Sequence, residues 1–328
     1  MEAPCVRVPR EEGERVRREL AEAGLRDHDL EIAVAEGWIY IPVADAAAVP
    51  AEFDVVARDV EPRDTQTMPT DLLPFEPTYE RLGDIVLLDE DDPERACEAA
   101  AAFMASDLPV KTVANKASEV RGEERVREWE VLAGDGTETI HREYGCAFAL
   151  DVARVYFSPR LATERHRVVE GVKAGERAFD MFCGVGPFAI PMAKRGAEVV
   201  GTDVNEVAIE YCRENARRNG VEDRVTAIHG DVREVAPDYA GWADRIVMNL
   251  PHSAAEFLDA ATTIAGEQCV VHYYDIQAAD DPFGPGEAAI RDAAGEEYDV
   301  EIAERRVVRS YSPVEVNVCI DARLARAR

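Results

Sequence analysis

A glycine-rich turn followed by an acidic residue is the part of this sequence best suited to hold a small-molecule cofactor. Residues 179–205 read FDMFCGVGPFAIPMAKRGAEVVGTDVN: an apolar strand ends at Asp180, glycines follow at Gly184 and Gly186, and a second strand ends at Asp203. Glycines let the backbone approach a ligand, and an acid about 20 residues further on can accept hydrogen bonds from ribose hydroxyls. The stretch therefore predicts a nucleotide-cofactor site in an open parallel sheet.

The glycine motif alone leaves the identity of the cofactor open. Residues 184–189 (GVGPFA) fit the G-x-G-x-x-G/A pattern of nicotinamide and flavin sites, and a tight turn without a ligand is a further alternative. S-adenosylmethionine is favoured because Pro187 lacks the backbone N–H that a pyrophosphate would need. Asp231 follows a third strand-like run and could accept from an adenine amino group, and Asn249 follows a fourth. Four strands that each end in a polar residue at one sheet edge favour this cofactor.

The tetrapeptide Asn249-Leu250-Pro251-His252 follows a buried strand beside the predicted cofactor. The Asn249 side chain and the Leu250 carbonyl can each accept a hydrogen bond from an exocyclic amine, and Pro251 stiffens the turn that aims them. An ordinary exit from a strand into a loop is the alternative. Contact with a substrate is favoured next to a cofactor edge, while His252 is not predicted to act as a base.

A carboxylate lies between arginines on the helix expected over residues 161–172. Arg160, Glu164 and Arg167 are spaced i, i+4 and i+7, which places them on one helical face. Spacing leaves two interpretations open. One is a surface ion-pair network of little energetic value; the other is a general base flanked by cations that hold a substrate.

The composition predicts a soluble protein of two or three domains. The chain has 328 residues, no apolar run near the ~20 residues of a membrane helix, and no signal sequence at its start. We therefore expect a cytoplasmic protein without a membrane partner. Its seven cysteines lack C-x-x-C spacing and are interpreted as free thiols, so no metal site is predicted.

The charge of the chain is strongly acidic, with 66 acids, 37 bases and a net charge of -29. Only four of the bases are lysines. A dense carboxylate surface stays hydrated in concentrated salt, so the balance predicts a halophile. Such a charge argues against a nucleic-acid partner, yet residues 111–177 carry 12 bases and 12 acids. That neutral stretch is either a chance fluctuation or a surface that faces a polyanion.

Three regions are expected along the chain. Residues 1–63 predict a small α/β unit, and the proline-rich segment 64–77 predicts a linker. A second region follows, and from residue 176 onward strands and helices alternate, which predicts a parallel sheet with helices on both faces. The expected strands lie at 5–8, within a hairpin across 31–43, and at 84–88, 109–114, 148–155, 178–182, 198–202, 225–229, 245–248, 268–276, 299–308 and 314–320; the expected helices lie at 11–23, 92–105, 161–172, 187–195, 206–219, 253–265 and 283–294.

Six motifs occur in one order with characteristic spacing. They are Gly122–Arg125, Tyr156–Leu161 with Glu164-Arg165, Asp180–Pro191, Asp203–Asn205, Asp231–Arg233 and Asn249–Pro251. Together they resemble the archaeal and eukaryal tRNA (guanine-37-N1)-methyltransferases over most of the chain. The resemblance implies an α/β protein in which a class I (Rossmann-like) methyltransferase domain, with a mainly parallel seven-stranded sheet, follows two smaller α/β domains.

The resemblance also assigns tasks to the three domains. It implies that residues 1–68 grip the outer corner of a tRNA, that residues 78–175 read the anticodon stem-loop, and that residues 176–328 bind S-adenosylmethionine. A monomer without an obligate protein partner is expected. The protein would act in tRNA processing, by modifying the anticodon loop.

The implied reaction moves a methyl group from S-adenosylmethionine to N1 of guanosine 37, with Glu164 as general base. Guanine N1 carries a proton at neutral pH, so a carboxylate must remove it as the methyl arrives. An arginine is suited to stabilising the charge that builds on O6. The implied catalytic residues are Arg125, Glu164, Asn249 and Pro251; the substrate contacts are Arg125, Tyr156, Arg160, Asn249 and Leu250; the cofactor contacts are Arg165, Asp180, Gly184, Gly186, Asp203, Val204, Asp231, Val232 and Asn249.

Three alternatives to this function stay open from the sequence. The nearest is a wyosine-pathway tRNA transferase, which uses the same cofactor on the same nucleotide to transfer an aminocarboxypropyl group or to methylate C7. The others are an RNA-binding protein that has lost catalysis and a nicotinamide dehydrogenase. The run Pro159-Arg160-Leu161 with Glu164-Arg165 resembles the methyltransferase version.

Overall fold

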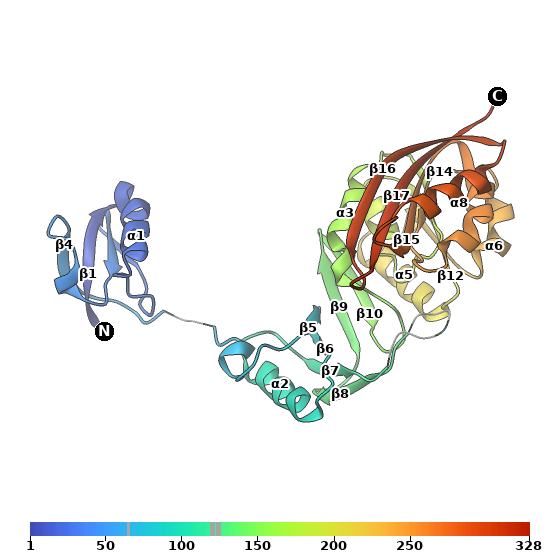
Figure 1. The fold of residues 1–328 in the computed structure, drawn as a ribbon. Coiled ribbons are helices and arrows are strands. Elements are labelled where there is room, and N and C mark those ends of the chain that lie inside the picture. The colour runs from blue at the N-terminus through green and yellow to red at the C-terminus, as the bar shows by residue number, and fades with distance from the viewer. Residues whose placement is uncertain (64–65, 119–121, 123–125) are drawn as a thin grey trace. The chain divides into compact units, whose positions relative to one another are not determined.

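A computed structural model describes residues 1–63, 66–118, 122 and 126–328 (Figure 1). Contacts divide the chain into two compact units, Met1–Met68 and Pro69–Arg328. The division expected near residue 175 falls inside the second unit, so the three-domain organisation stays a prediction. None of the helices in the described ranges is both long and apolar enough to cross a membrane.

The first unit is one helix on a four-stranded antiparallel sheet of order β2-β3-β1-β4. The predicted hairpin turns at Glu36 and Gly37, which both have positive φ (54° and 84°), as a two-residue hairpin turn requires. Val16 and Leu20 of the helix pack on Val6 and Ile41 of the sheet. The elements are β1 (Glu2–Pro9), α1 (Gly13–Glu22), β2 (Ala33–Ala35), β3 (Trp38–Pro42) and β4 (Asp54–Asp59).

The second unit begins with a small sheet of order β5-β6-β7-β8. Its central strands β6 and β7 are parallel and are joined by α2, whose N-cap Asp92 accepts from the backbone N–H groups of Glu94 and Arg95. Strands β9 and β10 follow as a separate antiparallel hairpin. The elements are β5 (Tyr79–Leu82), β6 (Ile85–Leu88), α2 (Pro93–Ala105), β7 (Thr112–Lys116), β8 (Trp129–Ala133), β9 (Glu138–Glu143) and β10 (Cys146–Asp151).

The predicted strand over 148–155 is wrong at its carboxyl end, because β10 ends at Asp151. The Asp151 side chain accepts from the Ala153 N–H at 2.9 Å, and its carbonyl accepts from Arg154 and Val155. A side chain that bonds its own backbone in this way turns the chain out of the strand. Strands β8 and β9 lie outside the predicted elements; β9 reads ETIHRE, a polar run that gives little strand signal.

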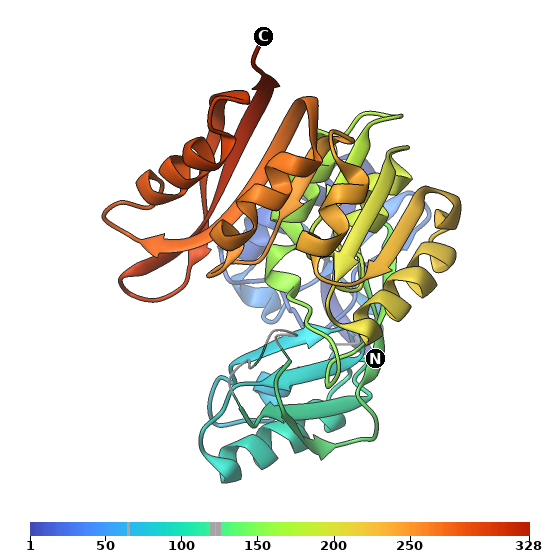
Figure 2. The ribbon, with the colours of Figure 1, turned by 90° about the vertical axis from the view of Figure 1, so that its right-hand side faces the viewer.

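A seven-stranded sheet of order β13-β12-β11-β14-β15-β17-β16 forms the rest of the molecule, as predicted for a mainly parallel sheet (Figure 2). The neighbours from β13 to β15 pair in parallel, and β17 is antiparallel to both β15 and β16. The elements are α3 (Ala162–Glu170), β11 (Arg177–Asp180), α4 (Ala189–Lys194), β12 (Glu198–Asp203), α5 (Glu206–Arg218), β13 (Val225–His229), α6 (Val232–Val235), β14 (Ala243–Met248), α7 (Leu258–Ile264), β15 (Ala265–Ala278), α8 (Gly284–Ala294), β16 (Tyr298–Ser310) and β17 (Glu315–Arg326).

Alternate residues of these strands fill two cores on opposite faces of the sheet. Ala178 and Val247 belong to the core beneath α3, α4 and α5, while their neighbours Phe179 and Ile246 belong to the core beneath α6, α7 and α8. A strand that is buried on both faces has to be apolar at every position, which is the pattern of a parallel sheet covered by helices. The continuous apolar runs in the sequence therefore follow from the layered fold.

Two asparagines of α5 fasten β10 to this helix layer. The fully buried Asn215 accepts from the Ala149 N–H at 2.7 Å and donates to the Ala149 and Val185 carbonyls, each at 3.0 Å. One turn later, Asn219 makes the same pair of bonds with Ala147 at 3.0 and 2.8 Å. The helix thus satisfies backbone groups of β10 as a neighbouring strand would. Because Val185 lies in the glycine turn, the same side chain also ties β10 to the predicted cofactor site.

We predict that Asn215→Ala lowers the free energy of unfolding by about 3 kcal/mol or more. The substitution leaves three buried backbone groups without partners, and each unpaired group costs about 1–3 kcal/mol. Guanidinium unfolding followed by circular dichroism measures the loss. Asn219→Ala is the matched control: its site is half-buried, so a smaller loss is expected, and equal losses would contradict the explanation.

Candidate functional site

Four neighbouring strands bring the predicted cofactor residues to one edge of the seven-stranded sheet. Asp180 ends β11 and Asp203 ends β12, while Asp231 is the second residue after β13 and Asn249 the first after β14. These strands are parallel and adjacent, so their carboxyl ends lie at the same edge. The strand order reverses between β11 and β14, and such a reversal opens the crevice in which α/β sheets bind ligands.

The glycine turn is held by the carboxylate of Asp203. The Gly184 N–H donates to Asp203 Oδ2 at 2.8 Å, and the Asn205 N–H donates to Oδ1 at 2.9 Å. Gly184 and Gly186 have φ of 51° and 92°, a region that disfavours side chains. A Cβ on Gly186 would also lie 2.8 Å from Ile190. Both glycines are therefore required by backbone conformation, and Gly186 also by close packing, while their contact with the cofactor stays a prediction.

Buried acceptors at this edge fit a cationic nucleoside. Asp180 is 1% exposed, and among the described residues no side chain donates to its carboxylate oxygens; the backbone N–H groups of Phe182 and Ala189 approach them, but lower the pKa of Asp180 less than burial raises it. Burial, with the nearby Asp203 carboxylate adding to it, raises the pKa of Asp180 to about 7. The side-chain oxygen of Asn249 is likewise buried without a donor in the part of the chain that is described. S-adenosylmethionine carries an ammonium group of the kind that could donate to Asp180, and the Asn249 oxygen is free to accept from a second bound group.

Asp231 is the N-cap of α6 and is paired with Arg233. Its Oδ1 accepts from the Arg233 N–H at 2.8 Å, and the Arg233 guanidinium binds both carboxylate oxygens. This ion pair lowers the pKa of Asp231. Beside it at the strand ends, Val232 is buried whereas Val204 is 39% exposed. The contacts of these three residues with the cofactor stay predictions.

The turn after β14 is closed by a backbone hydrogen bond. The Leu250 carbonyl accepts from the Ser253 N–H at 3.1 Å, which leaves it a second lone pair for a ligand. His252 has a φ of 87°, and its ring packs edge-to-face on Tyr311 at 5.2 Å between centroids. The substrate and catalytic roles of Asn249, Leu250 and Pro251 stay predictions.

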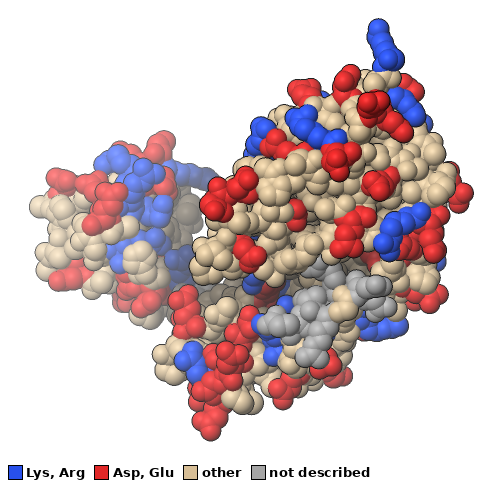
Figure 3. All heavy atoms as spheres, turned by 45° about the vertical axis from the view of Figure 1, so that its right-hand side comes forward, with Lys and Arg blue, Asp and Glu red and all other residues tan. Residues whose placement is uncertain are grey.

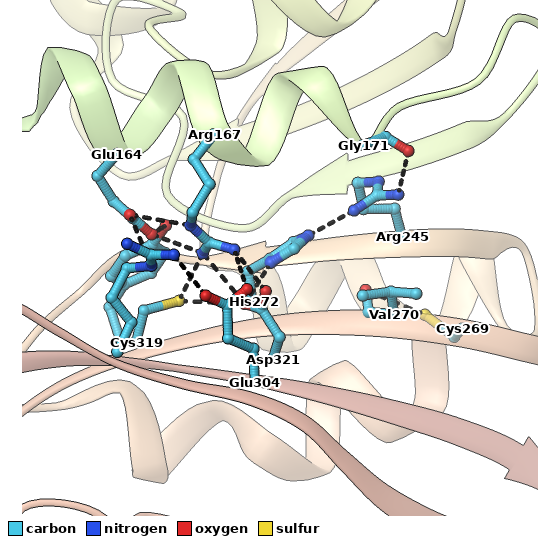
Figure 4. Close-up of polar contacts among 12 residues, drawn as sticks. Glu164, Arg167, Gly171, Arg245, Cys269, Val270, His272, Glu304, Cys319 and Asp321 are labelled. Atoms are coloured by element: carbon cyan, nitrogen blue, oxygen red, sulfur yellow. Dashed lines mark hydrogen bonds and ion pairs between the residues drawn. The ribbon is translucent and has the colours of Figure 1, made fainter.

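Glu164 lies in the interface between α3 and the sheet, not on the molecular surface (Figure 4). It is 7% exposed. Arg167 donates to Glu164 Oε1 at 2.7 Å and to Oε2 at 3.0 Å, and the Tyr274 hydroxyl donates to Oε1 at 2.9 Å. The interpretation as a surface ion-pair network is therefore wrong. Because Tyr273 pairs with Met248 in the sheet, Tyr274 and with it Glu164 lie close to the strand end that leads to Asn249.

The face predicted to join Arg160 to Glu164 does not form. Arg160 lies in the 3-10 turn Pro159–Leu161, before α3 begins at Ala162, and pairs instead with Glu80. Residues four apart share a helical face only when both lie in the helix. Arg160 precedes the first residue of α3, so the prediction fails for it. Only Glu164 and Arg167 share the predicted face.

Arg165 points away from this face toward β9. Its guanidinium donates to the two carboxylate oxygens of Glu143 at 2.7 and 2.6 Å and to the Ser158 carbonyl at 3.0 Å, and it lies 5.0 Å from the Phe157 ring centroid. These bonds hold the segment before α3 in place. A direct contact between Arg165 and the cofactor stays a prediction.

The segment around Tyr156 lies beside the glycine turn. Its carbonyl is 4.0 Å from the position of a Cβ on Gly184, and Asn205 Nδ2 donates to the Arg154 carbonyl at 2.9 Å. Tyr156 is 41% exposed. It lines a cavity of about 170 Å³ together with Arg160 and 14 other residues, Arg127, Trp129 and Arg309 among them. Arg125 lies outside the described residues, so its predicted role has no structural account.

Some of the arginines that make residues 111–177 neutral form ion pairs within the fold. Arg165 is paired with Glu143 and Arg167 with Glu164, and both of these acids are buried or largely buried. Arg177 is paired with Asp244. On the face drawn in Figure 3, acidic and basic side chains are interspersed. Part of the arginine content of this stretch therefore serves ion pairs within the fold.

Several residues of the site carry no local sequence signal. Tyr274 and Asp321 belong to β15 and β17, far from Glu164 along the chain. They read as ordinary strand residues, because the register of the β15–β17 pair is what brings them beneath α3. An acid within the largely apolar run VCIDA of β17 is the hint that the sequence offers.

The fold and the edge of the sheet define a class I S-adenosylmethionine-dependent methyltransferase. Residues 139–302 match the family model described as the TRM5/TYW2 methyltransferase domain. Residues 5–51 match the tRNA methyltransferase 5 N-terminal domain, and residues 65–137 match the TYW2 N-terminal domain. The chain belongs to the TRM5/TYW2 methyltransferase family.

Individual members of the family are similar over most of the chain. The tRNA (guanine(37)-N(1))-methyltransferase Trm5b of Pyrococcus abyssi is 41% identical, over 98% of this chain and 99% of its own; its crystal structure superposes with a TM-score of 0.75. The complex of aTrm5 with tRNALeu matches at 32% identity and a TM-score of 0.75, over 97% of this chain and 99% of that one. M. jannaschii TYW2 with AdoMet matches at 28% and 0.62, over 76% and 100%.

We predict that Gly186→Ala abolishes most cofactor binding, measured by calorimetry. The new side chain would be strained at a φ of 92° and would collide with Ile190, which displaces the turn. Gly220→Ala is the matched control, since its φ is 68° and no atom lies within 4 Å of the added Cβ. The control should lose only about 1 kcal/mol of stability and bind the cofactor normally. Equal binding by both variants would contradict this account of the turn.

We also predict that the free energy of unfolding falls as pH rises through about 7, partly because of Asp180. Its folded pKa of about 7 lies above the unfolded value near 3.9. The folded chain therefore holds this proton more tightly, and the resulting stability, up to about 4 kcal/mol, is complete below pH ~4 and lost through pH ~7. Asp180→Asn should flatten the profile between pH 5 and 8. An unchanged slope in the variant would contradict the assignment.

Proposed function

We propose that this protein transfers a methyl group from S-adenosylmethionine to N1 of guanosine 37 in the anticodon loop of tRNA. The observation that carries the proposal is a buried carboxylate, Glu164, held by Arg167 and Tyr274 next to the sheet edge that presents Asn249. A fixed carboxylate beside a methyl-donor site suits an acceptor that must lose a proton as it is methylated. Guanine N1 is such an acceptor.

Each residue of the site has a separate task in this mechanism. S-adenosylmethionine supplies an electrophilic methyl group on a sulfonium. Glu164 would take the proton from guanine N1, and the electron pair left on that nitrogen would form the new bond to the methyl carbon, while the sulfur leaves with the electrons of the broken C–S bond as a neutral thioether. The Asn249 side chain and the Leu250 carbonyl accept from the exocyclic amine of the base, and Pro251 keeps their geometry fixed. We assign stabilisation of the charge on O6 to Arg125.

The cofactor contacts follow from the same edge. Asp180 would accept from the ammonium group of the cofactor, which relieves the cost of its burial. The turn at Gly184 and Gly186 would let the cofactor lie close to the backbone, and the Asp203 carboxylate would accept hydrogen bonds from the ribose hydroxyls. We assign the adenine to Asp231, Val204 and Val232, and a supporting role on the cofactor side to Arg165.

The target base would enter through the cavity lined by Tyr156 and Arg160. An anticodon loop makes unstacking of one base inexpensive, and aromatic and arginine side chains offer stacking surfaces for it. We further propose that residues 1–68 contact the outer corner of the tRNA, that residues 78–175 contact the anticodon stem-loop, and that the protein acts as a monomer.

A wyosine-pathway activity on the same nucleotide is the second candidate, since the family model spans both TRM5 and TYW2. The higher identity to a Trm5b, 41% against 28% for the TYW2 above, favours methyl transfer to N1. Incubation with cofactor labelled separately in the methyl and the amino-acid carbons, followed by nucleoside analysis of the digested tRNA, separates the two. Label from the amino-acid carbons in the product would overturn our assignment.

We propose that the protein works in a cytoplasm of high salt. The net charge of -29 and the four lysines support this, because concentrated ions screen self-repulsion between carboxylates. Loss of secondary structure below molar salt, followed by circular dichroism, is the expected behaviour. Full stability in dilute buffer would overturn it.

We predict that Glu164→Gln slows single-turnover methylation of tRNA by about 10²–10⁴-fold, the usual contribution of a general base. The amide keeps the size of the side chain, so affinities for tRNA and cofactor should change little. Glu170→Gln is the matched control, on the same helix but exposed to solvent, and should react at the parental rate. A Glu164→Gln enzyme with the parental rate would reject Glu164 as the base.

A further inference from the structure

A row of polar side chains runs beneath α3 along one face of the sheet, starting at Glu164 (Figure 4). Its members come from α3, from the loop before β11, and from three neighbouring strands, β14, β15 and β17. Each member contacts the next by a hydrogen bond or an ion pair. We call this the buried polar row: Glu164, Arg167, Asp321, His272, Arg245 and Glu176.

Arg167 is shared between two carboxylates. One edge of its guanidinium binds Glu164, and the other donates to Asp321 Oδ2 at 2.6 Å and to Oδ1 at 3.3 Å. A further bond reaches the half-exposed Glu304 at 3.2 Å. These acids raise the pKa of Arg167 despite its burial. The guanidinium is therefore charged and fixed in orientation, and it divides its charge between Glu164 and Asp321.

The contacts of His272 define its tautomer. Arg245 can only donate hydrogen bonds, so the His272 Nε2 atom that it contacts must be the acceptor. The ring proton is then on Nδ1 and is donated to Asp321 Oδ1 at 2.7 Å. Burial, together with Arg245 and Arg167, lowers the pKa of His272, in keeping with a neutral ring. Asp321 is thus held from both sides by donors of fixed direction.

The far end of the row returns to α3. Arg245 donates to Glu176 Oε1 at 2.7 Å and to the carbonyl of Gly171 at 3.1 Å. Gly171 is the C-cap of α3, so the row binds the helix at both of its ends. The buried polar row therefore holds Glu164 in place through a continuous series of hydrogen bonds and ion pairs. Asp321 connects the Glu164–Arg167 pair to His272 and Arg245 in this series.

We propose that Asp321 is a positioning residue for methyl transfer, which acts on Glu164 through the arginine that they share. The inference rests on the proposed function of Glu164. When Glu164 takes the proton from guanine N1 it becomes neutral, and Arg167 loses one of its three carboxylate partners. Asp321 is the buried partner that remains, beside the half-exposed Glu304, so the charge of Arg167 is not left unpaired.

A metal site is the main competing explanation for this cluster. His272, Cys319 and Asp321 offer ligand atoms within 4.8 Å of one another. However, both ring nitrogens of His272 are engaged in hydrogen bonds, and the guanidinium of Arg167 contacts both oxygens of Asp321. A cation between these atoms would lie against a fixed positive charge. The cluster is therefore better explained as a support for Glu164.

A double-mutant cycle tests the proposal, with single-turnover methylation of tRNA and with cofactor and tRNA affinities as readouts. Asp321→Asn should slow the reaction about tenfold or more, a part of the roughly 10²–10⁴ that a general base provides, while both affinities stay within about twofold. In the Glu164→Gln background, Asp321→Asn should cost less than about twofold, because Asp321 acts only through Glu164. Asp244→Asn is the matched control: it breaks an Asp–Arg pair of the same sheet, between Asp244 and Arg177, that shares no bond with the buried polar row, and it should react at the parental rate.

Each outcome of the cycle decides the matter. An Asp321→Asn enzyme with the parental rate, or one with the same rate loss in both backgrounds, would overturn the inference, since a merely structural role gives additive losses. If Glu164→Gln itself reacts at the parental rate, the proposed function of Glu164 fails first. If Asp321→Asn does not fold by circular dichroism, His272→Asn enters the same cycle, because it weakens the hold on Asp321 and should show the same coupling to Glu164.

Discussion

The shared guanidinium of Arg167 is the interaction on which the catalytic half of this structure depends. Two carboxylates, Glu164 and Asp321, lie in a largely dry interface between α3 and the sheet. Ionised carboxylates are not stable in such a place without a cation and hydrogen-bond donors. Arg167 supplies both to each of them, and the position of α3 on the sheet follows from this pairing as much as from its apolar contacts.

The cofactor edge depends on a different constraint, the meeting of parallel strand ends where their order reverses. That geometry collects Asp180, Asp203, Asp231 and Asn249 without any of them being close in sequence. It also leaves Asp180 buried with an unsatisfied carboxylate. Burial of an acid at the end of an apolar core costs free energy, and a bound cation would offset this cost. The edge is therefore better suited to binding a ligand than to stabilising the fold.

Much of the fold could be predicted because its signals are local. Continuous apolar strands, caps and glycine turns placed most elements of the seven-stranded sheet within a few residues, although β17 continues to Arg326 beyond its predicted end and α6 was not predicted. Gly184 and Gly186 lie in a turn as predicted, while Asp203, predicted to contact ribose, accepts from the Gly184 N–H and so supports the turn. The errors arose where local signals fail. An Asx turn at Asp151 ended β10 early, β9 is too polar to stand out, and the helical register from Arg160 to Glu164 was broken by the start of α3.

The sequence by itself determined the class of the protein, since the polar residues that follow four successive strands, and the six motifs that carry the family resemblance, can be recognised from their order and spacing along the chain. It also singled out Glu164. It did not determine what surrounds Glu164. His272, Tyr274 and Asp321 become its neighbours through the antiparallel register of β15 and β17 and the docking of α3. Strand register and helix docking depend on long-range packing that buries the whole face of the sheet, so residue spacing along the chain does not predict them.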